Sequence, residues 1–534
     1  MRQSSPYLCA ALLVGISMAS TSRSLAQTKP SSHSIASWAR LLPSDRAPRF
    51  ADARGKVPVL LPSSAVAFDE RSQWLEIAPG LSSRWVDRQE LDSVATRTGA
   101  WVSPPLHTTI DVSAVQWTHT AAAHAAGHRG NGVLVGIIDT GIDLRHRDLR
   151  NADGSSRVAW SLIYRVLHSE RMPISSTSLV VMMLNKPRAL CSALTRSLQI
   201  SAAQAVPNSA DTIGHGTHVA GIAASNGGTQ GKYVGGAPNA DLIVARVTRG
   251  ASGGSISDAD VVNAARFVFG RADALGKPIV VNASLGGDFG PHDGTSPIET
   301  GLASFVGSKF PGHVMVVAAG NSGGIYTDGG TSYGPHTEVR VVSGSTTKVP
   351  LVALGGSGQI NGSVYVWITV QPSDQLKLGI EVGGETVLEP LGAGEQGGYP
   401  ELSGTRPYVG VINGVVGGTS PIVAGSYGAV AVIDGKWDAA TPISLVLEGP
   451  ATAQIWAQSI DGAASGTAAP VGVLLRGGIK PGTISTPATH PDLIAVGCTL
   501  NRTTWVSQGK QMPELAQFGS LINPKADSAC FFSA

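Results

Sequence analysis

The sequence predicts an α/β domain with a doubly wound, mainly parallel sheet, interrupted by an inserted β-rich module. Near-continuous apolar, β-branched runs recur along the chain and are typical of strands buried on both faces of a parallel sheet. At least one helical stripe alternates with them. Between about residues 323 and 479 the pattern changes to short alternating strands separated by Gly, Ser and Pro, which is typical of a β-sandwich.

The buried-strand pattern occurs four times, at residues 133–139, 242–247, 278–283 and 313–319. Between the second and third of these, residues 257–275 place their apolar side chains on one helical face, and Ser257 and Asp258 suit the N-terminal cap. Residues 492–497 return to the α/β pattern. The α/β domain is therefore expected to continue after the insert.

Length and composition set the organisation. A chain of 534 residues is too long for one ordinary core. Only 14% of its residues are charged and the net charge is +2, which argues against nucleic-acid binding. We expect a signal peptide over 1–26, a propeptide or N-terminal accessory segment over 27–105, the α/β domain over 106–325, the inserted module over 326–479, and a continued but truncated α/β domain over 480–534.

The N-terminus has the pattern of a secretory signal. Arg2 precedes an apolar stretch from Tyr7 to Ala19, and small residues follow up to Ala26, where cleavage is expected. A membrane anchor is the alternative, but the apolar stretch is shorter than the ~20 residues that a span needs. We therefore expect a secreted protein, extracellular or periplasmic, without stable membrane association. No pattern indicates its oligomeric state.

Asp139 and His215 suit acyl transfer, because a serine hydroxyl needs a histidine to accept its proton and a carboxylate to orient that histidine. Asp139 ends a buried strand, which places it at the carboxyl edge of the sheet where α/β sites gather. An aspartate there can also be a simple turn residue. His215 lies between Gly214 and Gly216, which permit close backbone approach. His218, three residues on, could in principle share a metal with it, but no further ligands are apparent, so we expect no metal and no cofactor.

Residues 137–141 and 215–221 resemble the Asp and His signatures of the subtilisin-like serine proteases, the subtilases, in that family's order with a serine expected last. The resemblance implies a subtilisin-like fold and a secreted serine endopeptidase acting on proteins or peptides. It also makes a structural calcium ion possible, although no ligand can be assigned.

Two further segments carry the resemblance. Residues 282–287 are similar to the family's substrate-pairing strand, which implies that Ser284, Leu285 and Gly286 bind an extended substrate by strand addition. Residues 318–323 resemble the oxyanion segment, which implies that the Asn321 amide donates to the developing negative charge.

The family's Gly-Thr-Ser-Met-Ala-like motif, expected some tens of residues after the strand at 494–497, is not found. Residues 418–425 are the only near match, so Ser420 is the candidate nucleophile. It is a poor one, because it precedes the strand it should follow and runs into a β-turn pattern. The alternative function is therefore a catalytically inactive, secreted pseudoprotease that binds peptides or glycans.

One stretch has an unusual composition. Residues 155–213 contain no glycine, although the chain has 66, and they hold three of its seven methionines. We interpret residues 163–206 as the product of a shifted reading frame, with a variable loop as the alternative, and the same hypothesis applies to residues 521–534. Without the signal, Cys191, Cys498 and Cys530 remain, which allows at most one disulfide and suggests no metal site.

Overall fold

The computed structural model describes residues 51, 55–94, 97, 99–102, 104, 106–108, 118–165, 178–183, 211–228, 233–249, 256–371, 373–400, 406–414, 427–461, 471–500 and 528–534. The expected signal peptide, Cys191 and Ser420 lie outside the described residues. So does most of the segment from 163 to 206.

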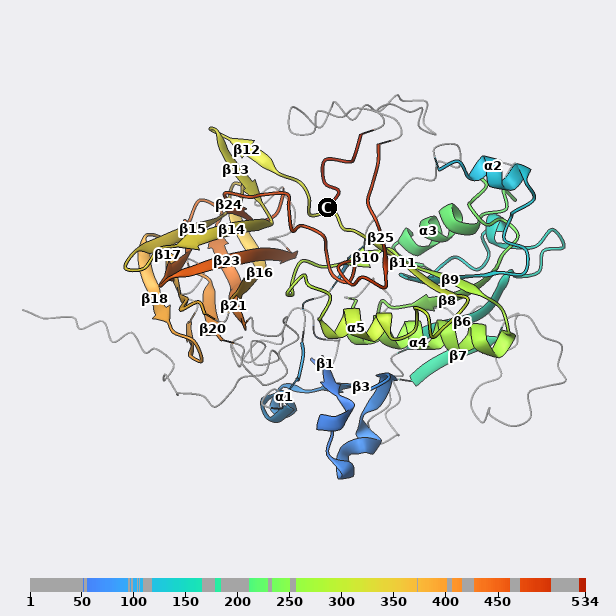
Figure 1. Cartoon of the computed structure of the whole chain (residues 1–534), viewed down its shortest axis with the longest axis horizontal. Helices are drawn as coiled ribbons and strands as arrows, with labels where there is room; N and C mark the ends of the chain where they lie inside the picture. Colours follow the sequence, from blue (N-terminus) through green and yellow to red (C-terminus); the bar gives the residue numbers. More distant parts are fainter. Residues whose placement is uncertain are drawn as a thin grey trace, which may run out of the picture.

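A seven-stranded sheet in the order β25-β11-β9-β5-β8-β6-β7 forms the centre of the α/β domain (Figure 1). All neighbouring pairs are parallel except β6 and β7. This arrangement confirms the predicted fold class, and the four predicted buried strands are β5, β8, β9 and β11. The strands are β5 (Leu134–Asp139), β6 (Val158–Arg165), β7 (Ser178–Met183), β8 (Asp241–Arg246), β9 (Ile279–Ala283), β11 (His313–Ala318) and β25 (Ile494–Val496).

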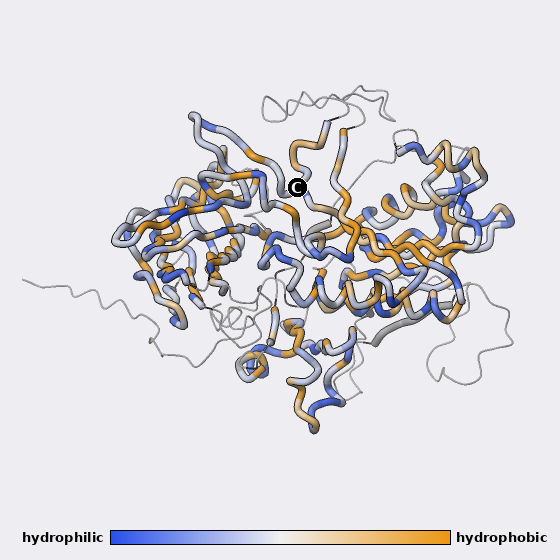
Figure 2. Tube along the Cα trace, viewed as in Figure 1, coloured by the Kyte–Doolittle hydropathy of each residue, from blue (hydrophilic) through white to orange (hydrophobic). Residues whose placement is uncertain are grey.

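Helices cover both faces of this sheet. In Figure 1, α4 (Asp258–Leu275) and α5 (Pro297–Ala303) lie on one side, and α3 (His215–Ala224) lies on the other. The predicted helix corresponds to α4: the Ser257 hydroxyl accepts a hydrogen bond from the Asp260 N–H at 3.2 Å, and the helix ends at Gly276. A short helix, α2 (Thr120–Ala125), precedes β5. The strands of the parallel sheet are among the most apolar parts of the chain (Figure 2).

An N-terminal unit packs against α4 and α5. It is a three-stranded antiparallel sheet in the order β1-β3-β2 followed by one helix. Its elements are β1 (Val57–Pro62), η2 (Ser63–Ala65), η3 (Phe68–Gln73), β2 (Leu75–Ala78), β3 (Leu81–Val86) and α1 (Arg88–Val94). The Trp101 indole donates to the Asp258 carboxylate at 3.0 Å, and the Arg249 guanidinium lies 3.9 Å from the centre of the Trp85 ring. The unit is thus fixed at the N-terminal end of α4.

The inserted module consists of two antiparallel sheets that enclose a separate apolar core. One sheet contains β12 (Tyr326–Asp328), β13 (Thr331–Gly334), β15 (Thr346–Val352), β17 (Lys377–Val382), β18 (Glu385–Leu391), β22 (Ile443–Glu448) and β24 (Leu474–Arg476). The other contains β14 (His336–Val341), β16 (Gln359–Val370), β19 (Gln396–Tyr399), β20 (Tyr408–Asn413), β21 (Tyr427–Asp438) and β23 (Ala451–Asp461). The predicted β-rich module is therefore present.

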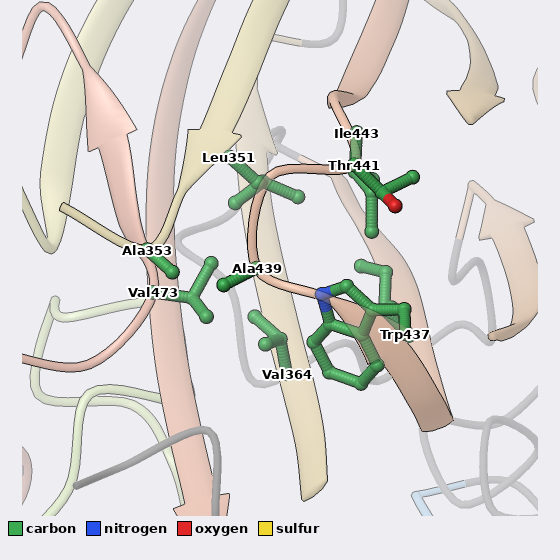
Figure 3. Close-up of a pocket in the computed structure, with 9 residues that line it drawn as sticks. Leu351, Ala353, Val364, Trp437, Ala439, Thr441, Ile443 and Val473 are labelled. Atoms are coloured by element: carbon green, nitrogen blue, oxygen red, sulfur yellow. The ribbon is translucent and has the colours of Figure 1, made fainter. Parts of the chain in front are cut away.

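The module has an apolar cluster that it shares with the rest of the molecule and a small internal hollow. The sheet that contains β16 and β23 buries Tyr365, Trp367 and Trp456 in the same apolar cluster as Phe289 of the α/β domain and Trp101 of the N-terminal unit. A small hollow, lined by Leu351, Val364, Trp437 and other mostly apolar residues, lies wholly within the module (Figure 3). The buried cluster, rather than the hollow, connects the module to the rest of the molecule.

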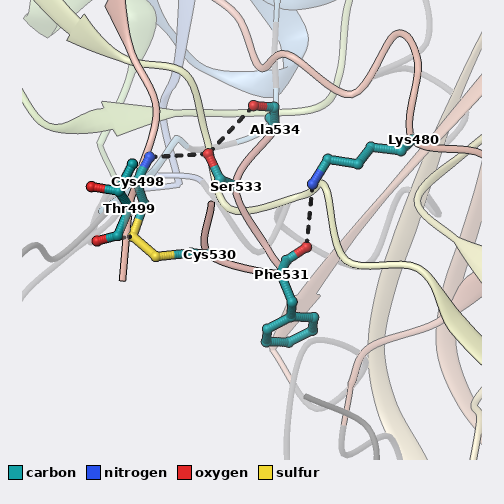
Figure 4. Close-up of a disulfide and its surroundings, with 7 residues drawn as sticks. All are labelled: Lys480, Cys498, Thr499, Cys530, Phe531, Ser533 and Ala534. Carbon is teal, nitrogen blue, oxygen red and sulfur yellow. Dashed lines mark hydrogen bonds between the residues drawn. A yellow bond between two sulfur atoms is a disulfide. The ribbon is translucent and has the colours of Figure 1, made fainter. Parts of the chain in front are cut away.

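Cys498 and Cys530 form a disulfide (Figure 4). It holds residues 528–534 beside residues 320–323: the Gly323 N–H donates to the Phe532 carbonyl at 2.8 Å, and the Ala534 N–H donates to the Gly320 carbonyl at 3.3 Å. One bridge is the most that the sequence allows once the signal is removed. Among the described residues, no helix combines the length and hydropathy needed to cross a bilayer.

Candidate active site

Asp139 and His215 meet in the interior of the α/β domain. Asp139 is the last residue of β5, between β8 and β9, and His215 is the first residue of α3. The His215 Nδ1 atom lies 2.6 Å from Asp139 Oδ1, and the two residues are 2% and 0% exposed. The structure therefore brings together the two residues that the sequence singles out.

The hydrogen bond fixes the chemistry of the ring. A carboxylate only accepts hydrogen bonds, so Nδ1 of His215 carries the proton of this bond, and in the neutral form of the ring Nε2 holds the lone pair. Asp139 Oδ1 also accepts from the Thr140 N–H at 2.6 Å, while Oδ2 is buried without a hydrogen-bond partner in the described part of the chain. Such an imidazole can accept a proton at Nε2 while the buried carboxylate stabilises the resulting charge.

Asp211 fixes the backbone around His215 through hydrogen bonds, a role that the sequence analysis did not predict. Its carboxylate accepts the N–H groups of Gly214 at 2.9 Å and Thr217 at 2.8 Å, and the Thr140 hydroxyl at 2.8 Å. Burial alone would raise the pKa of Asp211, but these hydrogen bonds outweigh it and the pKa lies below its ordinary value. An aspartate shortly before a helix start was the available signal.

Gly216 lets α3 approach β5. A Cβ atom at this position would lie 2.0 Å from the Gly141 carbonyl oxygen and 3.0 Å from Asp139 Oδ1. Gly214 has a φ of 88°, a left-handed conformation that suits glycine. Gly216 therefore permits the close backbone approach that the sequence predicts, whereas Gly214 has open space around it and serves the left-handed turn before the helix.

The predicted substrate strand already has a strand paired with it. Residues Leu285–Gly286 form β10, which pairs antiparallel with β4 (His107–Thr108), with Leu285 opposite Thr108 and Gly286 opposite His107. Ser284 lies between β9 and β10, and its hydroxyl accepts from the Asn282 side chain at 2.9 Å. Extended backbone is thus accommodated on β10.

Asn321 is exposed and follows Gly320, whose φ is 114°. It lies beyond the carboxyl end of β11, at the sheet edge that also carries Asp139, with β9 between the two strands. No hydrogen bond within the described residues joins the Asn321 side chain to Asp139 or His215. Within the same set, no cluster of three or more His, Cys, Asp or Glu side chains is placed to hold a metal ion.

The profile of the subtilase family, Peptidase_S8, matches residues 130–428. The chain belongs to the subtilase family. The matched range includes Asp139, His215 and Asn321 together with the first part of the inserted module.

Curated relatives agree with this membership. The chain is 30% identical over 194 residues to "Subtilisin" of Bacillus sp. (strain TA39), covering 36% of this chain and 35% of that protein. It is 31% identical over 211 residues to "Subtilisin-like protease PopC" of Myxococcus xanthus (strain DK1622), covering 38% and 36%. The "Minor extracellular protease Vpr" of Bacillus subtilis (strain 168) is 28% identical over 225 residues, which cover 42% of this subtilase and 22% of Vpr. The matches thus span little more than a third of each relative at most.

Among solved structures, the Clostridium perfringens CspB protease is similar with a TM-score of 0.49 and 20% sequence identity. The match covers 71% of this subtilase and 70% of that chain.

Proposed function

We propose that this subtilase is a secreted serine endopeptidase that hydrolyses peptide bonds in proteins or peptides. The buried 2.6 Å contact between His215 Nδ1 and Asp139 Oδ1 carries the proposal, because it orients the imidazole as general base catalysis requires. In the proposed reaction, His215 Nε2 removes the proton of a serine hydroxyl and later donates it to the leaving amine. Asp139 orients the ring and stabilises its positive charge.

The other side of the site binds the substrate. We assign the Asn321 amide to the developing oxyanion and Ser284, Leu285 and Gly286 to the extended substrate backbone. The pairing of β4 with β10 supports this assignment, because β4 makes the antiparallel contact that an added substrate strand would make. No metal or other cofactor takes part in these steps.

The N-terminal unit fits the role of a propeptide. It packs on α4 and α5, and β4, which follows it, lies on β10 just beyond the boundary of 105 that the sequence suggested. A segment held there excludes other peptides from the same strand. We therefore propose that residues 27–105 with β4 keep β10 occupied, and so block substrate binding, until cleavage after Thr108. N-terminal sequencing of the processed protein tests this, and a mature form that retains β4 contradicts it.

Secretion is proposed on the N-terminal signal pattern, and the Cys498–Cys530 disulfide supports it because such bonds persist in oxidising compartments.

Ser420 is the candidate nucleophile that the sequence offers. A serine-directed phosphonate with mass-spectrometric mapping of the labelled residue, run beside a fluorogenic peptide assay, tests the proposal. Labelling of one serine together with turnover is expected. Retained peptide binding with neither label nor turnover would instead show a pseudoprotease.

A further inference from the structure

Gln458, on β23 of the inserted module, contacts the segment that follows the substrate strand. Its side-chain oxygen accepts the N–H of Asp288 at 2.8 Å and the N–H of Phe289 at 3.1 Å. Gln458 is 2% exposed, so these bonds are shielded from water. The module therefore supplies a hydrogen-bond acceptor to the backbone that follows β10 in the chain.

The space around Gly287, between β10 and Asp288, is tight for a side chain. A Cβ atom at Gly287 would lie 3.0 Å from Gln458 Oε1 and 3.3 Å from Leu106 Cδ2. Leu106 immediately precedes β4, the strand that pairs with β10. Gln458 thus reaches the point where the substrate strand, the N-terminal segment and the module converge.

The side chain of Asp288 is hydrogen-bonded to the oxyanion segment, residues 318–323. Its carboxylate accepts the Ser322 hydroxyl at 2.5 Å and the Ser485 hydroxyl at 3.0 Å, and the residue is 8% exposed. Ser322 is the residue after Asn321. Ser485 in turn donates its N–H to the Ala319 carbonyl at 2.8 Å. Both flanks of Asn321 are therefore linked to Asp288.

Aromatic contacts hold the module at this place. The Phe289 ring meets Trp367 of β16 edge to face, with ring centres 5.4 Å apart. His292 stacks on Trp456 of β23 at 4.5 Å, and its two ring nitrogens face the carbonyl oxygens of Ile484 and Asp288. Because these side chains pack directly across the boundary, the module cannot shift without displacing the segment after β10.

We propose that Gln458 and Asp288 are positioning residues for the reaction, and that the inserted module is a working part of the active site. Gln458 fixes the backbone after the substrate strand, and Asp288 uses that position to hold Ser322 and hence Asn321. The catalytic effect that we infer rests on the proposed function. The coupling between residues 284–289 and residues 319–323 does not, because it is a property of the structure.

The test compares Gln458→Leu with Gln454→Leu in the full chain. Gln454 is on the same strand and face, but it bonds His336 and Glu338 rather than the site. Because small displacements of positioned groups can cost about 10²-fold in rate, Gln458→Leu should lower kcat by about that factor with a smaller change in KM. Gln458→Glu, which keeps an acceptor, should recover most of the loss, and Gln454→Leu should match the wild type.

Hydrogen exchange supplies a readout that needs no turnover. In Gln458→Leu, exchange should accelerate in both 284–289 and 319–323, whereas Ser322→Ala, a milder change, should affect only 319–323. Faster exchange confined to 288–289, or equal behaviour of the two glutamine variants, overturns the inference. A wild type that cleaves nothing but shows coupled exchange would refute the proposed function and the catalytic consequence of Gln458, and would support only the structural coupling between the two segments.

Discussion

The two sides of the candidate site are built in different ways. The Asp139–His215 side lies within the α/β domain. Thr140 and Gly216, which support it, belong to the two motifs, and Asp211 lies four residues before His215. The side that contains β10 and Asn321 is assembled from separate segments, including Ser485 and Gln458 of distant parts of the chain. A local motif can specify the first side, whereas the second depends on the whole fold.

The largest expected effect tests the local side. His215→Ala should lower kcat by about 10⁶-fold, the loss measured for the equivalent change in subtilisin, because no base would remain to activate the serine. His218→Ala is the control, since His218 is exposed on the same helix. Steady-state hydrolysis of a fluorogenic peptide measures both. Comparable losses in the two variants would remove His215 from the proposed mechanism.

A substitution on the side that contains β10 and Asn321 should cause a smaller loss of kcat. Asn321→Ala should reduce kcat by about 10²–10³-fold, the range measured for an oxyanion donor in subtilisin, with KM nearly unchanged. Asn239→Ala provides a control on a surface loop, where the side chain bonds only its neighbour Asn131 among the described residues. If the loss falls mainly on KM, Asn321 binds substrate rather than the transition state.

Two glycines of α3 test the close packing on the Asp139–His215 side through their effect on the free energy of unfolding. Gly216→Ala should lower the free energy of unfolding by about 1–3 kcal/mol, because the new methyl group would overlap the Gly141 carbonyl. Gly221→Ala should raise it by about 0.5–1 kcal/mol, since no atom of the described residues beyond its own helix lies within 4 Å of the added group and alanine favours the helix. Denaturant unfolding measures both values, and equal effects would contradict the proposed close approach at Gly216.

The smallest expected effect is on the stability of the protein at low pH. Because the pKa of Asp211 is lowered in the folded protein, its contribution to stability is present above the ordinary aspartate pKa of about 3.9 and disappears as the pH falls through the lower folded value. Asp211→Asn should flatten this part of the curve of unfolding free energy against pH. An unchanged curve would mean that the hydrogen bonds to Asp211 do not favour its charged form.

The sequence predicts the sheet and the first side of the site well, for a physical reason. Buried strands such as β5 and β8 require unbroken apolar runs, and Gly216 beside His215 marks a close backbone approach. The partners of Asp288 could not be predicted, because a serine or glutamine can bond almost any neighbour and only the tertiary fold selects one. The pairing of β4 with β10 involves two residues on each side, too few to leave a periodic pattern.

The position of the insert also has a consequence for folding. β11 and β25 are neighbours in the sheet, with Val316 opposite Ile494, although the whole module separates them in sequence. Closing so long a flexible loop carries an entropic cost, but the pairing of β13 with β24 brings the two ends of the module together. Once folded, the module therefore behaves as a short connection. We expect the module to fold first and β25 to join the sheet last, so that the substrate strand and Asn321 are brought into register late in folding.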